Sequence, residues 1–173
     1  TRGKHVMHTS LLGVMSGSPG HGPNVVLIVL DTARVDAFSP YGASPDATPA
    51  VASLAARGRA IDNVFSTANW TLPAHLSMLT GQLPREAGLA LDVSRAVNNA
   101  TNAQAVGSLA GQSLPAVLSA AGWTASGASA NPWISAQNGF ADGFDHFESV
   151  SGTRRVNPFA RAVPGEKKLA RTV

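Results

Sequence analysis

Hydrophobic positions along the chain form one unbroken run and several shorter segments. The run Val25–Leu30 shows no alternation of apolar and polar residues, and it ends at Asp31. Such a run is typical of a strand that is buried on both faces, as in a parallel sheet. Two more short apolar segments, Ala60–Phe65 and Trp123–Ala130, predict further strands.

Three other segments have helical spacing, with a proline near the start and a glycine after the end. They are 49–57, 71–79 and 113–121, followed by Gly58, Gly81 and Gly122. Proline in the first turn and glycine after the last residue are typical helix boundaries. Because strands and helices alternate, the sequence predicts an α/β fold, with a largely parallel sheet flanked by helices.

The chain divides into three parts by composition. Residues 1–23 contain clustered glycine and proline and predict a flexible leader, with only a short apolar island at 11–15. Residues 24–150 form the predicted folded part, in which 93–112, rich in Ala, Asn and Gly, is expected to be an irregular loop. Residues 151–173 are predicted to be a basic, disordered tail.

Composition and charge narrow the class of function. The chain has 173 residues, 44% of them hydrophobic, and no cysteine, which excludes disulfides, thiolate metal sites and a cysteine nucleophile. Six of the 13 basic residues lie in 154–171, so the net charge of +3 comes from the tail and does not indicate a nucleic-acid surface. No apolar run approaches 18 residues, so no membrane span is predicted. Compartment and oligomeric state stay open.

Three residues are candidates for chemistry. Asp31 lies at a strand end, where α/β sheets bind ligands, and its carboxylate suits Mg²⁺ or Ca²⁺. Thr71 begins a helix, where free N–H groups favour sulfate or phosphate. A hydroxyl beside a bound metal can lose its proton and attack such a group. His75 follows one turn later on the same helix face. The simpler interpretations are a turn cap for Asp31, an N-cap for Thr71 and a surface position for His75.

Several motifs in order resemble the sulfatase family of the alkaline-phosphatase-like superfamily. The resemblance covers roughly residues 23–148. It is carried by these motifs, in order: Pro23–Asp36, Tyr41-Gly42 with Thr48–Gly58, Trp70–Gly81 with Leu83-Pro84, and finally Leu114–Gly122, Asn131–Trp133 and Gly139–Phe147. It implies an incomplete alkaline-phosphatase-like fold, a divalent metal such as Ca²⁺ or Mg²⁺, and a small sulfate or phosphate ester as substrate.

The resemblance also implies roles for single residues. Asp31 and Thr71 correspond to metal ligands, and Thr71 also corresponds to the nucleophile. True sulfatases have there a Cys or Ser that is matured to formylglycine. Threonine does not undergo that maturation, whereas related phosphotransferases do use Thr nucleophiles. His75 stands where the family has Arg, and Thr32 stands where many members have a second acid.

Three functions follow as alternatives. The first is a metal-dependent sulfatase-like hydrolase, present as an N-terminal fragment. The second is a phosphoester hydrolase or phosphotransferase that uses Thr71. The third is a non-catalytic fragment, because the family's later metal ligands have no counterpart in the chain. Asp145-His146 superficially suggests such ligands, but its surroundings predict a structural role.

Overall fold

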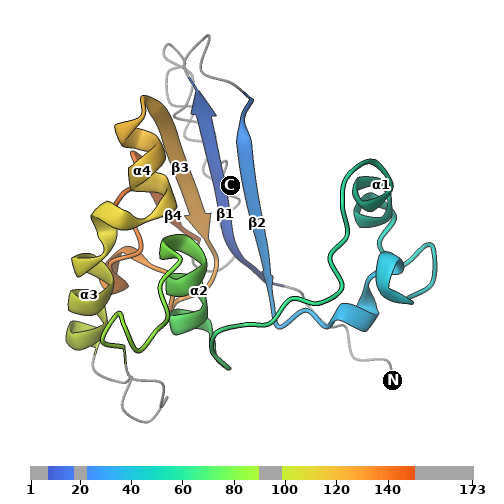
Figure 1. Ribbon diagram of the computed structural model, residues 1–173, viewed down its shortest axis with the longest axis horizontal. Helices are drawn as coiled ribbons and strands as arrows, with labels where there is room; N and C mark the ends of the chain where they lie inside the picture. The colour runs from blue at the N-terminus through green and yellow to red at the C-terminus, as the bar shows by residue number, and fades with distance from the viewer. Residues whose placement is uncertain (1–7, 18–22, 90–98, 151–173) are drawn as a thin grey trace, which may run out of the picture.

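The computed structural model describes residues 8–17, 23–89 and 99–150, which build a four-stranded sheet and the helices beside it (Figure 1). The strands are β1 (His8–Gly17), β2 (Val25–Asp31), β3 (Trp123–Ser129) and β4 (His146–Ser149). The α-helices are α1 (Pro49–Arg57), α2 (Thr71–Thr80), α3 (Asn99–Ser108) and α4 (Leu114–Ala120). Short 3₁₀ turns are η1 (Val35–Ala37), η2 (Ser39–Tyr41), η3 (Ala110–Gln112) and η4 (Ala136–Asn138).

The sheet has the strand order β2-β1-β3-β4 and is mixed. β1 runs antiparallel to both β2 and β3, whereas β3 and β4 are parallel. The fold is therefore α/β as predicted, but the prediction of a largely parallel sheet is wrong. Since β2 and β3 are both antiparallel to β1, they point in the same direction as each other, and β4 follows them. The single reversed strand, β1, lies between β2 and β3.

β1 also corrects the predicted leader. Residues 8–17 form a strand between two others, although we expected a flexible segment over 1–23. The apolar residues 11–15 explain why this segment forms a strand, because Met15 is buried in the core and only 1% exposed. Gly13 is buried as well, with Phe144 beside it. The rest of the predicted leader, apart from Pro23, and the predicted tail 151–173 lie outside the described residues.

β2 is an edge strand in the described sheet. The prediction that it is buried on both faces is wrong. Val25, Val26 and Ile28 are 37%, 56% and 58% exposed. An unbroken apolar run indicates a strand, but it does not reveal how many neighbours that strand has. Only Leu27, Val29, Leu30 and Asp31 are half-buried, so burial in β2 increases toward its carboxyl end.

The three predicted helices are confirmed as α1, α2 and α4. Ser113 caps α4, with its hydroxyl accepting a hydrogen bond from the Ala116 amide at 3.4 Å. Gly81 ends α2 in the left-handed conformation, at φ 72°. Thr48 precedes α1 as expected, but its hydroxyl accepts from the Ser39 amide at 2.8 Å and does not cap the helix. Thr48 thus connects the start of α1 to η2 through a hydrogen bond.

Two local predictions are wrong. Ala60–Phe65 does not form a strand. The segment is solvent-exposed, with Phe65 87% exposed, and no described strand pairs with it. The predicted irregular loop 93–112 contains α3. Alanine favours helix, and Val106 is 4% exposed because it packs into the core, which outweighs the Asn and Gly content of the segment.

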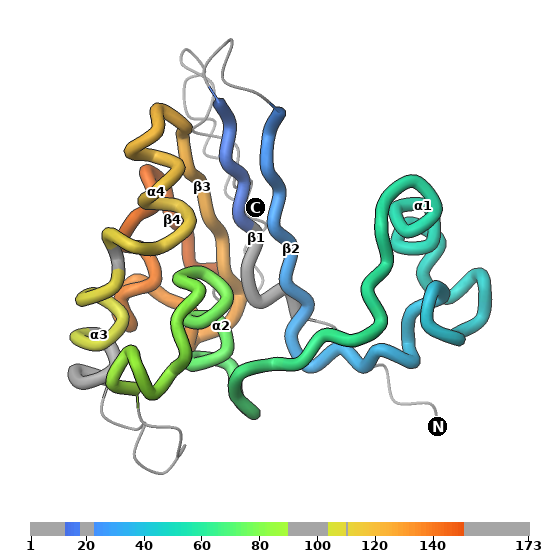
Figure 2. Tube along the Cα trace, viewed as in Figure 1, coloured from blue at the N-terminus to red at the C-terminus, as the bar shows by residue number. Residues whose placement is uncertain are grey.

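The main core lies between α2, α3 and the turn that follows β3 (Figure 2). Its buried residues are Leu72, Leu76, Leu79, Ala87, Leu89, Val106, Leu109, Ile134 and Phe140. By contrast, η1, η2 and α1 form an arm that projects beyond the β2 edge of the sheet (Figure 1). The helix that begins at Thr71 is therefore anchored in the main core of the described residues.

Candidate active site

The structure brings Asp31 and Thr71 together. The Thr71 hydroxyl (Oγ1) donates a hydrogen bond to Oδ2 of Asp31 at 3.0 Å, and both residues are half-buried. Trp70 occupies the N-cap position of α2, so Thr71 is the first helical residue and its hydroxyl is not a cap. The interpretation of Thr71 as an N-cap is therefore wrong, and its side chain instead contacts Asp31 at the end of β2.

The local sequence explains this placement. Leu72 and Leu76 are 0% and 2% exposed, and they anchor one side of α2 in the core. Pro73 is the third residue of the helix, where no intrahelical N–H bond is required. The first backbone bond of the helix runs from the Ala74 amide to the Trp70 carbonyl oxygen, at 3.4 Å. The first turn is thus fixed with the Thr71 hydroxyl directed toward Asp31.

Thr32, directly after Asp31, has φ 55°. It is the only non-glycine residue in the described segments with positive φ. A β-branched residue in the left-handed region is a genuine outlier, and such strain costs roughly 1–3 kcal/mol. The strained residue lies where the chain leaves β2, beside the candidate carboxylate.

Asn131 is a third member of the cluster. Its amide nitrogen (Nδ2) donates to Oδ2 of Asp31 at 2.7 Å. The family resemblance includes Asn131 in one of its motifs but implies no role for it. An Asn-Pro pair directly after a buried strand was the available signal, because the carboxyl ends of β2 and β3 share one edge of the sheet.

His75 lies one turn after Thr71, and it is buried, with 4% exposure, contrary to the surface interpretation. Its Nδ1 is 2.8 Å from the Thr71 carbonyl oxygen. Because a carbonyl only accepts hydrogen bonds, Nδ1 is the protonated nitrogen. Burial lowers the pKa of His75, while the bond to Thr71 and the charge of Asp31 oppose that effect. The ring is therefore neutral near pH 7, and Nε2 is a proton acceptor.

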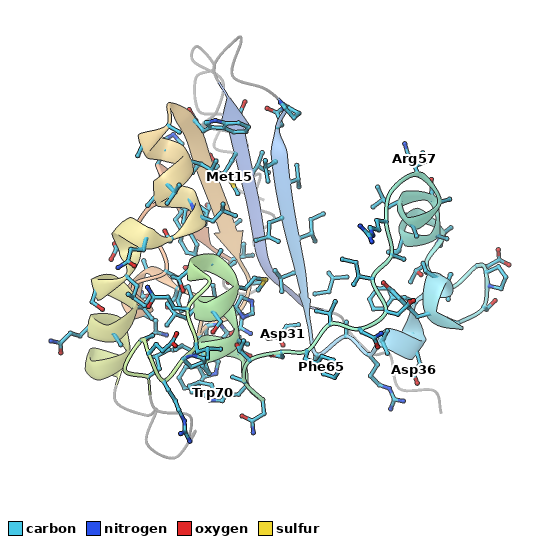
Figure 3. The ribbon with its side chains drawn as sticks, in the orientation of Figure 1. Met15, Asp31, Asp36, Arg57, Phe65 and Trp70 are labelled. Carbon is cyan, nitrogen blue, oxygen red and sulfur yellow. The ribbon has the colours of Figure 1, made fainter. Side chains whose placement is uncertain are left out.

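A wide, open cavity of about 970 Å³ adjoins these residues. Asp31, Phe65 and Trp70 lie around the end of β2 (Figure 3), and all three line this cavity. Three further atoms on lining residues are buried and have no hydrogen-bonding partner in the described structure: Trp70 Nε1, His75 Nε2 and Ser77 Oγ. Buried polar groups are normally paired, so this side of α2 has unused hydrogen-bonding capacity.

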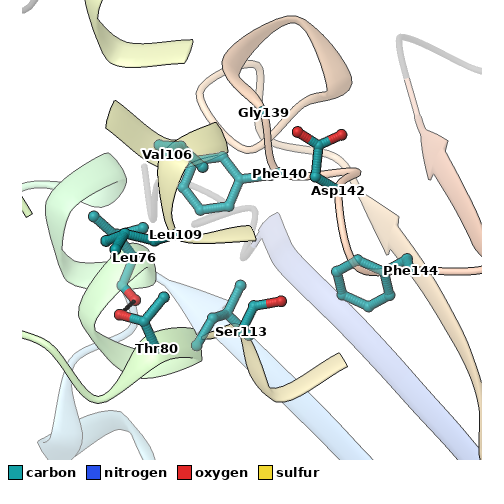
Figure 4. Close-up of a pocket in the computed structure, with 10 residues that line it drawn as sticks. Leu76, Thr80, Val106, Leu109, Ser113, Gly139, Phe140, Asp142 and Phe144 are labelled. Atoms are coloured by element: carbon teal, nitrogen blue, oxygen red, sulfur yellow. Dashed lines mark hydrogen bonds between the residues drawn. The ribbon is translucent and has the colours of Figure 1, made fainter. Parts of the chain in front are cut away.

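A second pocket lies inside the core and is too small to be a substrate site (Figure 4). Its volume is about 20 Å³, enough for about one water molecule. Leu76, Leu109 and Phe140 are among its lining residues. We therefore regard it as a packing gap.

Asp31 and Thr71 supply hard oxygen donors of the kind that Ca²⁺ and Mg²⁺ prefer. Their oxygens are 3.0 Å apart, so one cation could contact both. Within the described segments no group of three or more His, Cys, Asp or Glu residues could hold a metal ion. The donors therefore fit such an ion in kind, but by themselves they would supply only part of its coordination shell.

Other acidic residues have structural partners. Asp145 accepts a hydrogen bond from the Ala125 amide at 2.7 Å, and Ser119 donates to it at 3.3 Å, which agrees with its predicted structural role. Arg34 and Asp36 form an exposed ion pair at 2.6 Å, close to the end of β2. The hydrogen bonds between the two side chains, together with their opposite charges, lower the pKa of Asp36 and raise that of Arg34. Neither group belongs to the cluster around Thr71.

Comparison with protein families agrees with the geometry. Residues 23–157, well over half of the chain, match the family model described as Sulfatase. The chain belongs to the sulfatase family. Sulfatases act on sulfate esters and generally use a divalent metal, and membership implies an alkaline-phosphatase-like fold. No curated protein and no solved structure matches the chain significantly. Among the described helices, none has the length and apolarity that crossing a membrane requires.

Proposed function

We propose that Thr71 is the nucleophile of a metal-dependent hydrolase that cleaves small sulfate esters. The observation that supports this most is the hydrogen bond from Thr71 to Asp31 at the carboxyl end of β2. It places a hydroxyl and a carboxylate at the start of a helix, beside a large open cavity. The N-terminal end of a helix favours an anionic group.

In the proposed reaction, the Thr71 oxygen forms a bond to the sulfur of the ester while the bond from sulfur to the alcohol oxygen breaks. Asp31 already accepts the hydroxyl hydrogen bond, so it is placed to receive the Thr71 proton. That proton reaches the leaving alcohol through solvent. Water then cleaves the ester on Thr71, which releases sulfate and restores the hydroxyl.

Asp31 and Thr71 would hold the divalent ion. When bound, the ion would make the hydroxyl more acidic and offset charge on the transferred group. His75 suits the second step, since Nε2 of its neutral ring is buried without a partner and would accept a proton from water after a small rearrangement. Trp70 Nε1, a buried donor without a partner, is available to an ester oxygen after a small rearrangement.

A phosphate ester is the second candidate substrate. Thr71 is an ordinary alcohol, and an alcohol can form a phosphoester intermediate that water cleaves. The hydroxyl thus supports phosphoester hydrolysis or phosphotransfer on the same scaffold. The two candidates use the same residues and differ in the group that is transferred.

The test compares hydrolysis of 4-nitrophenyl sulfate and 4-nitrophenyl phosphate by the wild type, Thr71→Ala and Thr71→Ser. Thr80→Ala is the matched control, because Thr80 lies in the same helix and its hydroxyl binds the Leu76 carbonyl oxygen at 2.8 Å. We expect Ala at position 71 to lower kcat by about 10³-fold or more, and Ser to retain part of the rate. Dialysis against a chelator should abolish hydrolysis, and Ca²⁺ or Mg²⁺ should restore it.

Mass spectrometry of quenched reactions should find a sulfuryl or phosphoryl group on Thr71. An unchanged rate in Thr71→Ala would exclude this nucleophile. If the wild type hydrolyses neither ester and binds neither metal ion by calorimetry, the chain is the non-catalytic fragment.

A further inference from the structure

Both polar atoms of the Asn131 side-chain amide are hydrogen-bonded. Nδ2 donates to Asp31 Oδ2 at 2.7 Å, and Oδ1 accepts from the Trp133 backbone amide at 2.9 Å. A backbone N–H can only donate, so the oxygen of Asn131 has to face Trp133. The nitrogen therefore has to face the carboxylate, and the amide can have only this orientation.

The turn that contains Asn131 is itself held in place. The backbone amide of Asn131 donates to the Ser129 hydroxyl at 3.1 Å. That hydroxyl in turn donates to the backbone carbonyl oxygen of Asn131 at 3.2 Å. Ser129 is the last residue of β3 and is 2% exposed. Asn131 is thus fixed to the end of a buried strand.

The same turn also reaches the helix that begins at Thr71. The rings of Trp133 and Trp70 meet edge to face, with centroids 5.6 Å apart and planes at 82°. Such pairs contribute about 0.5–1.5 kcal/mol beyond their buried area. Trp70 directly precedes Thr71, so one short turn contacts Asp31 through Asn131 and the start of α2 through Trp133.

We propose that Asn131 is a positioning residue that orients the Asp31 carboxylate toward Thr71. This inference rests on the proposed function of Asp31 and Thr71. A direct metal ligand would use its oxygen, but Oδ1 of Asn131 faces the Trp133 amide, and it is Nδ2, which cannot bind a cation, that contacts Asp31. Asn131 therefore acts through Asp31. Partners that hold a metal ligand in this way typically change metal affinity or activity 10–100-fold when removed.

The first experiment tests the contact without requiring activity. In the ¹⁵N-labelled full chain, the side-chain amide resonances of Asn131 are assigned by their loss in Asn131→Ala. Asp31→Asn, which keeps the shape and removes the charge, should shift these resonances strongly. It should leave the side-chain amide resonances of exposed Asn63 unchanged. If the Asn131 resonances do not move in Asp31→Asn, the inference is wrong, whatever the enzyme does.

The second experiment separates a positioning residue from a ligand. Affinity for Ca²⁺ and Mg²⁺ is measured by calorimetry, and kcat/KM is measured on both 4-nitrophenyl esters. Asn131→Ala should weaken metal binding and lower kcat/KM by about 10–100-fold, whereas Asn63→Ala should change neither. Asn131→Asp should lower metal affinity and kcat/KM at least as much. It replaces the Nδ2 donor with a second carboxylate about 2.7 Å from that of Asp31.

Tighter metal binding by Asn131→Asp than by wild type would overturn the inference and identify position 131 as a ligand. Far-UV circular dichroism on each variant confirms that it is folded. If the wild type shows neither hydrolysis nor metal binding, the proposed function is wrong, but the contact between Asn131 and Asp31 is not thereby disproved. In that case the amide resonances decide whether Asn131 holds Asp31.

Discussion

The imidazole of His75 is hydrogen-bonded to the backbone of Thr71, the residue that we propose as the nucleophile. The distance from Nδ1 to the Thr71 carbonyl oxygen is 2.8 Å, and the two residues are one helical turn apart. The bond fixes the ring tautomer, so the proton acceptor and the hydroxyl belong to one rigid helical turn.

Stability should decrease in mild acid because of His75. Burial lowers its pKa below the ordinary value of 6.5 in the folded protein. Below pH 6.5 the unfolded chain takes up a proton that the folded chain does not bind, so unfolding becomes more favourable until the folded pKa is reached. Urea unfolding of the wild type at several pH values should show this loss. His75→Gln should lack it, and His146→Gln, at an exposed position, should keep it.

Replacing Thr32 with glycine should stabilise the fold. At φ 55° a threonine is strained and a glycine is not, which favours the variant by about 1 kcal/mol after the extra entropy of its unfolded chain is subtracted. Thr67→Gly, at an exposed loop position without positive φ, should be neutral or destabilising. Thermal unfolding measures both. Equal effects of the two changes would contradict strain at Thr32.

Gly127 should not tolerate a side chain. A Cβ at this position would lie 2.8 Å from an atom of Phe144 and 3.0 Å from an atom of Phe147. The two rings also pack on each other, with centroids 5.4 Å apart, so neither can move freely. We expect Gly127→Ala to destabilise by about 1–3 kcal/mol in urea unfolding. Gly111→Ala, where no atom lies within 4 Å, should cost less than about 0.5 kcal/mol.

Asp145 should matter for stability and not for chemistry. Removing its carboxylate leaves the Ala125 amide without its 2.7 Å partner, and an unpaired buried donor costs about 1–3 kcal/mol. Asp145→Ala should therefore lower the unfolding midpoint, while kcat/KM of the folded fraction stays at the wild-type value. A loss of metal affinity in this variant would show instead that Asp145 contributes to the site.

Local patterns in the sequence were enough to predict several elements. Proline, serine and glycine at helix ends located α1, α2 and α4, because capping depends on neighbouring residues alone. The candidates Asp31 and Thr71 followed from strand-end and helix-start positions, and the structure places them in contact. Their roles as metal ligand and nucleophile stay predictions.

Long-range relationships could not be predicted in this way. Nothing local indicates that Met15 pairs with Ala125, so β1 was interpreted as a leader and the sheet as largely parallel. The exposure of Val26 and Ile28 likewise depends on which strand lies next to β2. Asn131 was missed as a site residue because its partner, Asp31, is 100 residues away.

The position of β1 has a consequence for the order in which the protein folds. β1 pairs with β2 close by in the sequence, but it reaches β3 only by closing a loop of about a hundred residues. The hydrogen bond from Asn131 to Asp31 closes nearly the same loop. Because non-local pairings form slowly, we expect the site to assemble in the last folding step. Pulsed hydrogen exchange should then find the β3 amides protected later than those of α2.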